Sequence, residues 1–98
     1  MSHRSQTPRS LGSVLEGLID RLGIRRRLLD AAAVDAWSEV TGPAIAAVTD
    51  SVWMSSGRLF VKISSPTWRH ELNLQRDEWK DRINRQVGSP VVKEIVFR

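Results

Sequence analysis

The sequence contains no cysteine, and this absence excludes disulfide bonds, thiolate catalysis and metal sites built from cysteine. It also has no apolar run of the length that crosses a membrane. The polar start MSHRSQTPRS lacks the apolar region of a signal peptide. We therefore expect a protein of the reducing cytosol with no membrane partner.

Catalytic motifs are missing as well. The sequence has no Walker loop, no GxGxxG and no HExxH, and its two histidines, His3 and His70, belong to no cluster of metal ligands. His70 and Glu71 are adjacent, so on a helix they point in different directions and do not form an acid–base pair. We expect that the protein is not an enzyme and binds no cofactor, metal or small-molecule substrate.

The residues that are present suit one small globular domain. The 98 residues are 41% hydrophobic and 27% charged, which allows one modest core. The net charge of +4 favours an anionic partner such as nucleic acid or an acidic protein surface. Residues 1–9 are polar and contain Arg4 and Arg9, so we predict a flexible basic arm at 1–9 and a single domain at 10–98.

Two helices are predicted in the first half of the chain. The first runs from Ser10 to Leu22, and Gly23 suits the left-handed conformation just after it. Its apolar residues follow the helical template without a gap: Leu11, Val14, Leu15, Leu18, Ile19 and Leu22. The second runs from Ile24 or Arg25 to Val40 and ends at Gly42-Pro43, after which Pro43 can begin a short third helix. Its apolar face is predicted from Leu28, Leu29, Ala33, Ala36, Trp37 and Val40.

The apolar period then changes to two residues. The segments SVWMSS and RLFVKIS are typical of strands, and Ser56-Gly57 between them suits a tight hairpin. Within the second segment Leu59, Val61 and Ile63 share one face, which we predict to be the core face. Phe60 and Lys62 then lie on the opposite face.

A long helix and a last strand complete the predicted fold. Ser65 as cap and Pro66 at the first position indicate a helix that runs to about Val87 and ends at Gly88, and VVKEIVFR is typical of a strand. The order α-α-(α)-β-β-α-β predicts an α+β domain of two layers, with the helices packed on one face of a three-stranded sheet.

Two tryptophans on the long helix have two possible roles, as stacking platforms for nucleic-acid bases or as core residues. On a continuous helix Trp68, Leu72, Trp79 and Ile83 form one narrow stripe. Such a stripe matches the side of a crossover helix that faces the sheet. We therefore predict that both tryptophan rings are buried.

Six basic residues are the candidates for contact with nucleic acid. Beside the tryptophan stripe, a positive line along the helix is suited to a phosphate backbone. The cluster RRR at the start of the second helix opposes the helix dipole, so an anionic partner would stabilise it. The candidates are Arg25, Arg26, Arg27, Arg69, Arg76 and Lys80.

The order of these motifs resembles the DciA family of bacterial proteins. The resemblance covers residues 11–98 and rests on three segments: W-SEV-TG-PAIAAVTDSV, G-RLFVKISSPTWRHEL and INRQVGSPVVKEIVFR. Within them Trp37, Gly42, Trp68, Glu71 and Phe97 hold the spacing of the family pattern.

The resemblance implies a KH-like α+β fold and a role in DNA replication. It implies that the protein binds the replicative DnaB-type helicase and single-stranded or forked DNA, and assists helicase loading in the cytoplasm at the nucleoid. A KH domain that clamps nucleotides uses a Gly-x-x-Gly loop, and no two glycines here stand three residues apart. Two alternatives remain open: an RNA-binding, ribosome-associated KH-like module, and an adaptor that binds only proteins.

Overall fold

The computed structural model describes the backbone of residues 3–98 and the side chains of residues 11–98. The elements, in chain order, are α1 (His3–Leu22), α2 (Ile24–Thr41), α3 (Pro43–Ala46), β1 (Thr49–Ser55), β2 (Arg58–Ile63), α4 (Pro66–Leu74), α5 (Arg76–Val87) and β3 (Glu94–Phe97). This arrangement confirms the predicted two-layer α+β class, including the short third helix, with one additional helix before the last strand.

The three strands form one mixed sheet in the order β1-β2-β3. β1 pairs with β2 in antiparallel orientation, and β2 pairs with β3 in parallel orientation after the crossover through α4 and α5. The predicted hairpin at Ser56-Gly57 is confirmed, because both residues have positive φ, 52° and 81°. This two-residue turn fixes the register and places Trp53 opposite Phe60.

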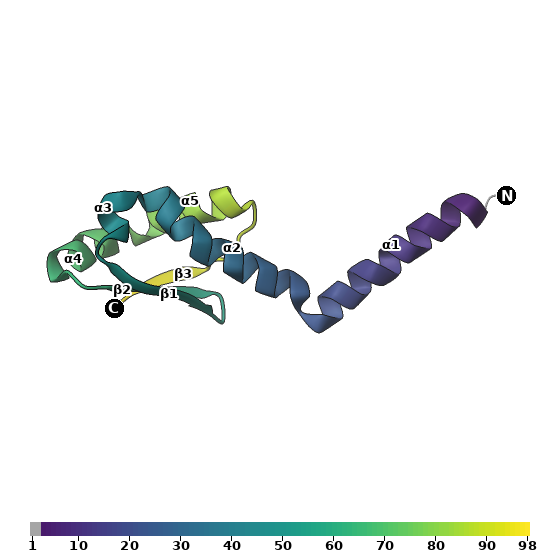
Figure 1. The fold of residues 1–98 in the computed structure, drawn as a ribbon, viewed down its shortest axis with the longest axis horizontal. Helices are drawn as coiled ribbons and strands as arrows, with labels where there is room; N and C mark the ends of the chain where they lie inside the picture. Colours follow the sequence, from purple (N-terminus) through teal and green to yellow (C-terminus); the bar gives the residue numbers. More distant parts are fainter. Residues whose placement is uncertain (1–2) are drawn as a thin grey trace.

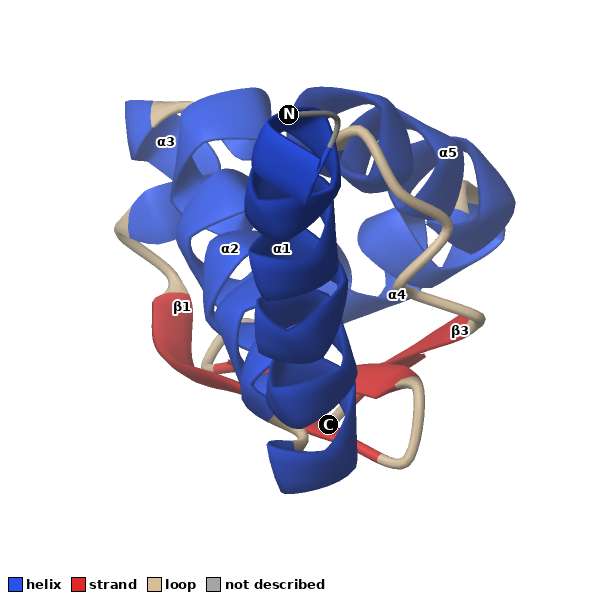
Figure 2. Cartoon of the chain, turned by 90° about the vertical axis from the view of Figure 1, so that its right-hand side faces the viewer, coloured by secondary structure: helices blue, strands red, loops and turns tan. Residues whose placement is uncertain are grey.

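The core lies on one side of this sheet. Leu59, Val61 and Ile63 are buried, which confirms the predicted core face of β2. Helices cover this side only, and the strands lie below them in Figures 1 and 2. At the centre the Trp37 ring lies 5.8 Å from Trp79 in an edge-to-face arrangement and 5.7 Å from Phe97. These three side chains join α2, α5 and β3.

The predicted continuous helix from Ser65 to Val87 is wrong, because it is interrupted at Gln75. Ser65 does cap the start, since its side chain accepts a hydrogen bond from the Trp68 amide, and Gly88 ends the helix in the left-handed conformation. Gln75 has φ −111° and ψ 21°, outside the helical range. Asp77 and Glu78 in the first turn of α5 complement the dipole of a new helix, and this local signal marks the restart.

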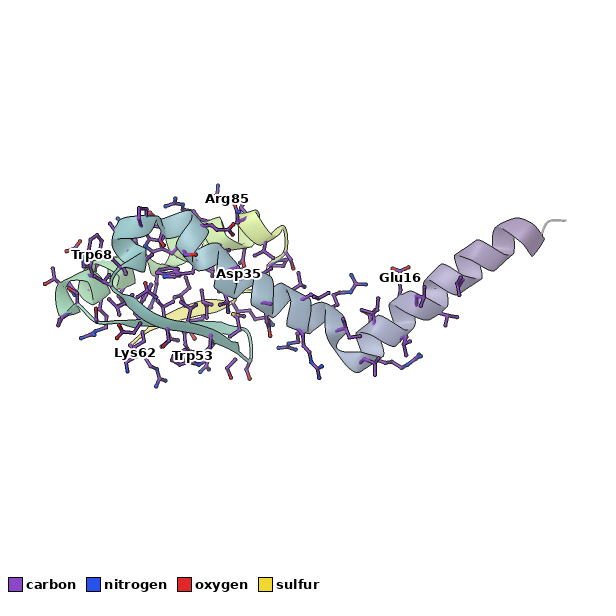
Figure 3. All side chains as sticks on the ribbon, in the orientation of Figure 1. Glu16, Asp35, Trp53, Lys62, Trp68 and Arg85 are labelled. Atoms are coloured by element: carbon purple, nitrogen blue, oxygen red, sulfur yellow. The ribbon has the colours of Figure 1, made fainter. Side chains whose placement is uncertain are left out.

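The two tryptophans of this region have different environments. Trp79 is 9% exposed and belongs to the core with Leu72 and Ile83, as predicted. Trp68 is 37% exposed, so its predicted burial is wrong. It lies in the first turn of α4, at the outer end of the domain (Figure 3). The prediction placed Trp68 and Trp79 on one stripe because it assumed a continuous helix. The interruption at Gln75 breaks that helix, so the two side chains no longer share one face.

α1 departs most from the prediction. It begins at His3 rather than at Ser10, so most of the segment 1–9 predicted as a flexible arm is helical, while residues 1–2 lie outside the described residues. The helix continues through Pro8, although proline lacks the backbone N–H that a helix interior uses. Figure 1 shows α1 projecting away from the sheet, and the molecule measures 66 × 20 × 20 Å. None of the helices described for residues 3–98 is both long and apolar enough to cross a membrane.

The last strand is shorter than predicted because the segment before it is held by a side chain. The Asn84 amide group donates to the Val92 carbonyl at 2.9 Å, and its oxygen accepts from the Val92 N–H at 3.0 Å. Val92 is buried although it belongs to no strand. The Asn84 side chain therefore satisfies the backbone N–H and C=O of Val92, as a neighbouring strand would, and fixes the path of the chain from α5 to β3.

Substitution of the two tryptophans is expected to separate their roles. Trp79→Ala leaves a cavity in the core and should cost about 3–5 kcal/mol of unfolding free energy, a large share of the roughly 5–15 kcal/mol typical of a domain. Trp68→Ala, the matched control, should cost about 1 kcal/mol or less because that ring is already partly in solvent. Urea unfolding followed by circular dichroism measures both, and equal losses would contradict the assignment.

Candidate functional site

The arginine cluster lies at the start of α2, next to the joint with α1. Gly23 takes the left-handed conformation at this joint, with φ 70° and ψ 17°, as predicted. Arg25, Arg26 and Arg27 are all exposed. The Arg25 Nε donates to Asp20 Oδ1 at 2.9 Å across the joint, and this hydrogen bond together with the charge of Asp20 raises the pKa of Arg25.

Arg26 and Arg27 differ from Arg25 in their surroundings. Among the side chains of residues 11–98, neither takes part in an ion pair. They stand in the first turn of a helix, where the dipole disfavours positive charge. An anion bound there would relieve both the mutual repulsion and the dipole cost.

The three other basic candidates do not form one line. The interruption at Gln75 puts Arg69 on α4, whereas Arg76 and Lys80 lie on α5. Arg69 Nη1 donates to the Ile63 carbonyl at 3.0 Å and so fastens the start of α4 to the end of β2. Lys80 is partly buried, with Nζ 4.0 Å from Asp81 Oδ1. Arg76 is exposed.

A second feature is the uncovered apolar stripe of α1. Its predicted residues keep their helical spacing but do not pack on the sheet. Their exposed fractions range from 41% to 61% for Leu11, Val14, Leu15, Leu18 and Leu22. Leu28, predicted on the inner face of α2, is also exposed. An amphipathic helix with an uncovered apolar face is the usual element of helix-in-groove recognition between proteins.

A third feature, on the open face of the sheet, was not among the predicted sites. Trp53 and Phe60 stack there with ring centroids 5.3 Å apart and an interplanar angle of 6°. The Arg98 guanidinium lies 5.1 Å from the centroid of Phe60. In Figure 3, Trp53 and Lys62 both point away from the helices. The sequence held a signal for this group, because a two-residue turn at Ser56-Gly57 pairs position 53 with position 60.

Residues 11–98 include no group of three or more His, Cys, Asp or Glu side chains placed to hold a metal ion. One open hollow lies between α2 and α5 and is lined by residues that include Glu39, Arg82 and Arg85.

Comparison with known proteins gives one clear match. The model of a protein family described as "Dna[CI] antecedent, DciA" matches residues 10–97, which is nearly the whole chain. No curated protein matches the chain.

The salt dependence of oligonucleotide binding tests whether Arg26 and Arg27 contact phosphates. Replacing Arg26 and Arg27 by Gln should weaken binding of a single-stranded oligonucleotide and reduce the slope of log K against log salt by about 1.4, at about 0.7 per phosphate contact on a single strand. Fluorescence anisotropy over a series of salt concentrations measures the slope. Removing Arg85 and Lys93 in the same way is the matched control for net charge. An unchanged slope in the first variant, or an equal change in the control, would exclude the cluster.

Proposed function

Because the chain belongs to the DciA family, we propose that it is an accessory protein of bacterial DNA replication that binds the replicative DnaB-type helicase and DNA and assists loading of the helicase. The match of the family model over residues 10–97 is the observation that carries this proposal. The proposed role places the protein in the cytoplasm, at the nucleoid.

The protein acts without chemistry of its own in this proposal. The sequence has no phosphate-binding loop for ATP, so the free energy of ATP hydrolysis enters through the helicase. The accessory protein contributes binding energy: it holds the helicase and a segment of DNA at the same time. Tethering the two raises the local concentration of each near the other, and this requires separate surfaces for protein and DNA.

The DNA contact in this proposal is electrostatic and independent of sequence. Exposed Arg26, Arg27 and Arg76 bind phosphates, while Arg25, Arg69 and Lys80 add positive charge from positions that are also held by contacts within the chain. The element order and the two-layer packing support a KH-like domain. The chain lacks the Gly-x-x-Gly loop of the nucleotide clamp in KH domains, so basic side chains take over the contact with the backbone.

The helicase contact is assigned to α1 in this proposal. Its apolar stripe is the longest uncovered run of large apolar side chains in residues 11–98, and it stands clear of the domain (Figure 1). A groove on a folded protein can bury such a stripe, and burial of apolar area supplies the affinity. The partner is then a helicase groove lined by apolar side chains.

A loading assay tests the proposed function directly. The cognate helicase is mixed with a closed single-stranded DNA circle, with and without this protein, and the helicase retained on the circle after a salt wash is measured. We expect retention to rise several-fold with the protein present. No gain in retention, together with preferred binding of RNA over DNA, would favour an RNA-binding module. A gain in retention with no DNA binding by the protein alone would favour an adaptor for proteins.

A pair of α1 variants tests the helicase surface. Leu18→Asp puts a charge into the apolar stripe and should weaken helicase capture by at least tenfold, because an ionised carboxylate is costly to bury. Ser13→Asp adds the same charge on the opposite side of α1 and should leave capture unchanged. Pull-down with immobilised helicase measures both variants. If Leu18→Asp retains full capture, α1 is not the helicase surface.

A further inference from the structure

The face of the sheet that the helices leave open has its own chemistry. Alternation along the strands sends Val52 and Met54 of β1 and the core residues of β2 toward the helices. The opposite face then carries side chains from all three strands: Ser51, Trp53, Arg58, Phe60, Lys62, Glu94, Val96 and Arg98. This face points to solvent in Figures 2 and 3.

A short aromatic stack crosses this open face. Trp53 on β1 is 39% exposed, and Phe60 on the neighbouring β2 covers one face of its ring. Arg98, which directly follows β3, lies over Phe60, so the order across the sheet is Trp53, Phe60, Arg98. A cross-strand aromatic pair contributes a little to the stability of a sheet. The exposed area of a tryptophan in the outer position of the stack also leaves room for another planar ring.

The charges around this stack are mainly positive. Arg58, Lys62 and Arg98 provide three cations, and Glu94 provides one anion, so these four residues carry a net charge of 3 − 1 = +2. Arg58 Nε lies 3.2 Å from Glu94 Oε1, while Lys62 has no ion-pair partner among residues 11–98. Lys62 and Arg98 are thus available to an anion beside the aromatic rings.

We propose that this open sheet face binds single-stranded DNA, with a base stacked on Trp53 and the neighbouring phosphates held by Lys62 and Arg98. The combination of exposed aromatic rings and cations fits a ligand that presents flat apolar rings and negative charges in alternation. A duplex hides its bases inside the helix and offers only the phosphates. The inference rests on the proposed function, because that function supplies DNA rather than RNA as the polymer, and it adds a base-stacking surface to the arginine contacts.

Stacking and charge contacts predict different responses to salt. Trp53→Leu removes the ring and should weaken binding of a 20-nucleotide oligo(dT) by roughly 5- to 100-fold, with an unchanged slope of log K against log salt. Lys62→Gln should weaken binding and reduce the slope by about 0.7. Trp53→Phe keeps a ring and should recover much of the loss. Trp68→Leu removes the other partly exposed tryptophan, on α4, and should bind like the unmodified chain.

The measurement is fluorescence anisotropy of labelled oligo(dT) on the full chain, with thermal unfolding of each variant as a folding control. If Trp53→Leu unfolds, the oligo(dT) affinities of Trp53→Phe and of Lys62→Gln, a change at an exposed residue, still test the proposed site. Equal affinity of Trp53→Leu and the unmodified chain overturns the proposal. Tenfold tighter binding of oligo(U) than oligo(dT) overturns the assignment to DNA. Equal competition by polyglutamate shows a surface that selects for charge alone and overturns the base-stacking role.

Helicase capture, measured in parallel, separates this inference from the proposed function. A Trp53→Leu variant that loses oligo(dT) but still captures the helicase supports both. An unmodified chain that loads the helicase and binds oligo(dT), with a Trp53→Leu variant that binds oligo(dT) equally well, overturns this inference alone. A chain that binds oligo(dT) through Trp53 but neither captures nor loads the helicase overturns the proposed function and leaves the stacking surface in place.

Discussion

The fold depends on the contact of three aromatic rings, Trp37, Trp79 and Phe97, in the single core. They come from α2, α5 and β3, and α2 is far from the other two in the sequence. The Trp37 Nε1–H donates to Thr49 Oγ1 at 3.2 Å, so its polar edge is satisfied as the ring is buried. The Arg82 guanidinium lies 4.6 Å from the Trp79 ring and donates to the Val40 carbonyl, which ties α5 to α2 at the surface.

This one-sided core determines which surfaces remain for partners. All the packed helices lie on the same face of the sheet, and among the described residues no helix covers the other face. The core is also complete without α1, whose apolar stripe finds no place in it. A domain of this size can bury only one modest core. The open sheet face carries aromatic rings and cations, whereas the stripe of α1 is aliphatic, so the two surfaces differ in chemistry.

Local signals in the sequence predicted most of the fold. Ser65 with Pro66, Gly23, Gly88 and the turn at Ser56-Gly57 each act within a few residues, and the structure has each as expected. The predictions that were wrong concerned features that depend on tertiary packing. An amphipathic sequence such as that of α1 looks the same whether the helix packs on its own core or on another protein. The identity of Gln75 also gave no sign of the interruption there, because glutamine favours helix, and Trp68 is therefore 37% exposed where burial was predicted. Arg69, Arg76 and Lys80 were predicted to form one line for the same reason, because a continuous helix was assumed.

The left-handed glycine at position 23 has a mechanical consequence. It is the single residue between two long helices, and the exposed ion pair of Arg25 with Asp20 spans it. A 20-residue helix is about 30 Å long, so a change of about 20° in direction at Gly23 moves the far tip of α1 by about 10 Å. Exposed ion pairs add little stiffness and weaken with salt. A change of direction at Gly23 would therefore displace the apolar stripe of α1 without altering the packed core.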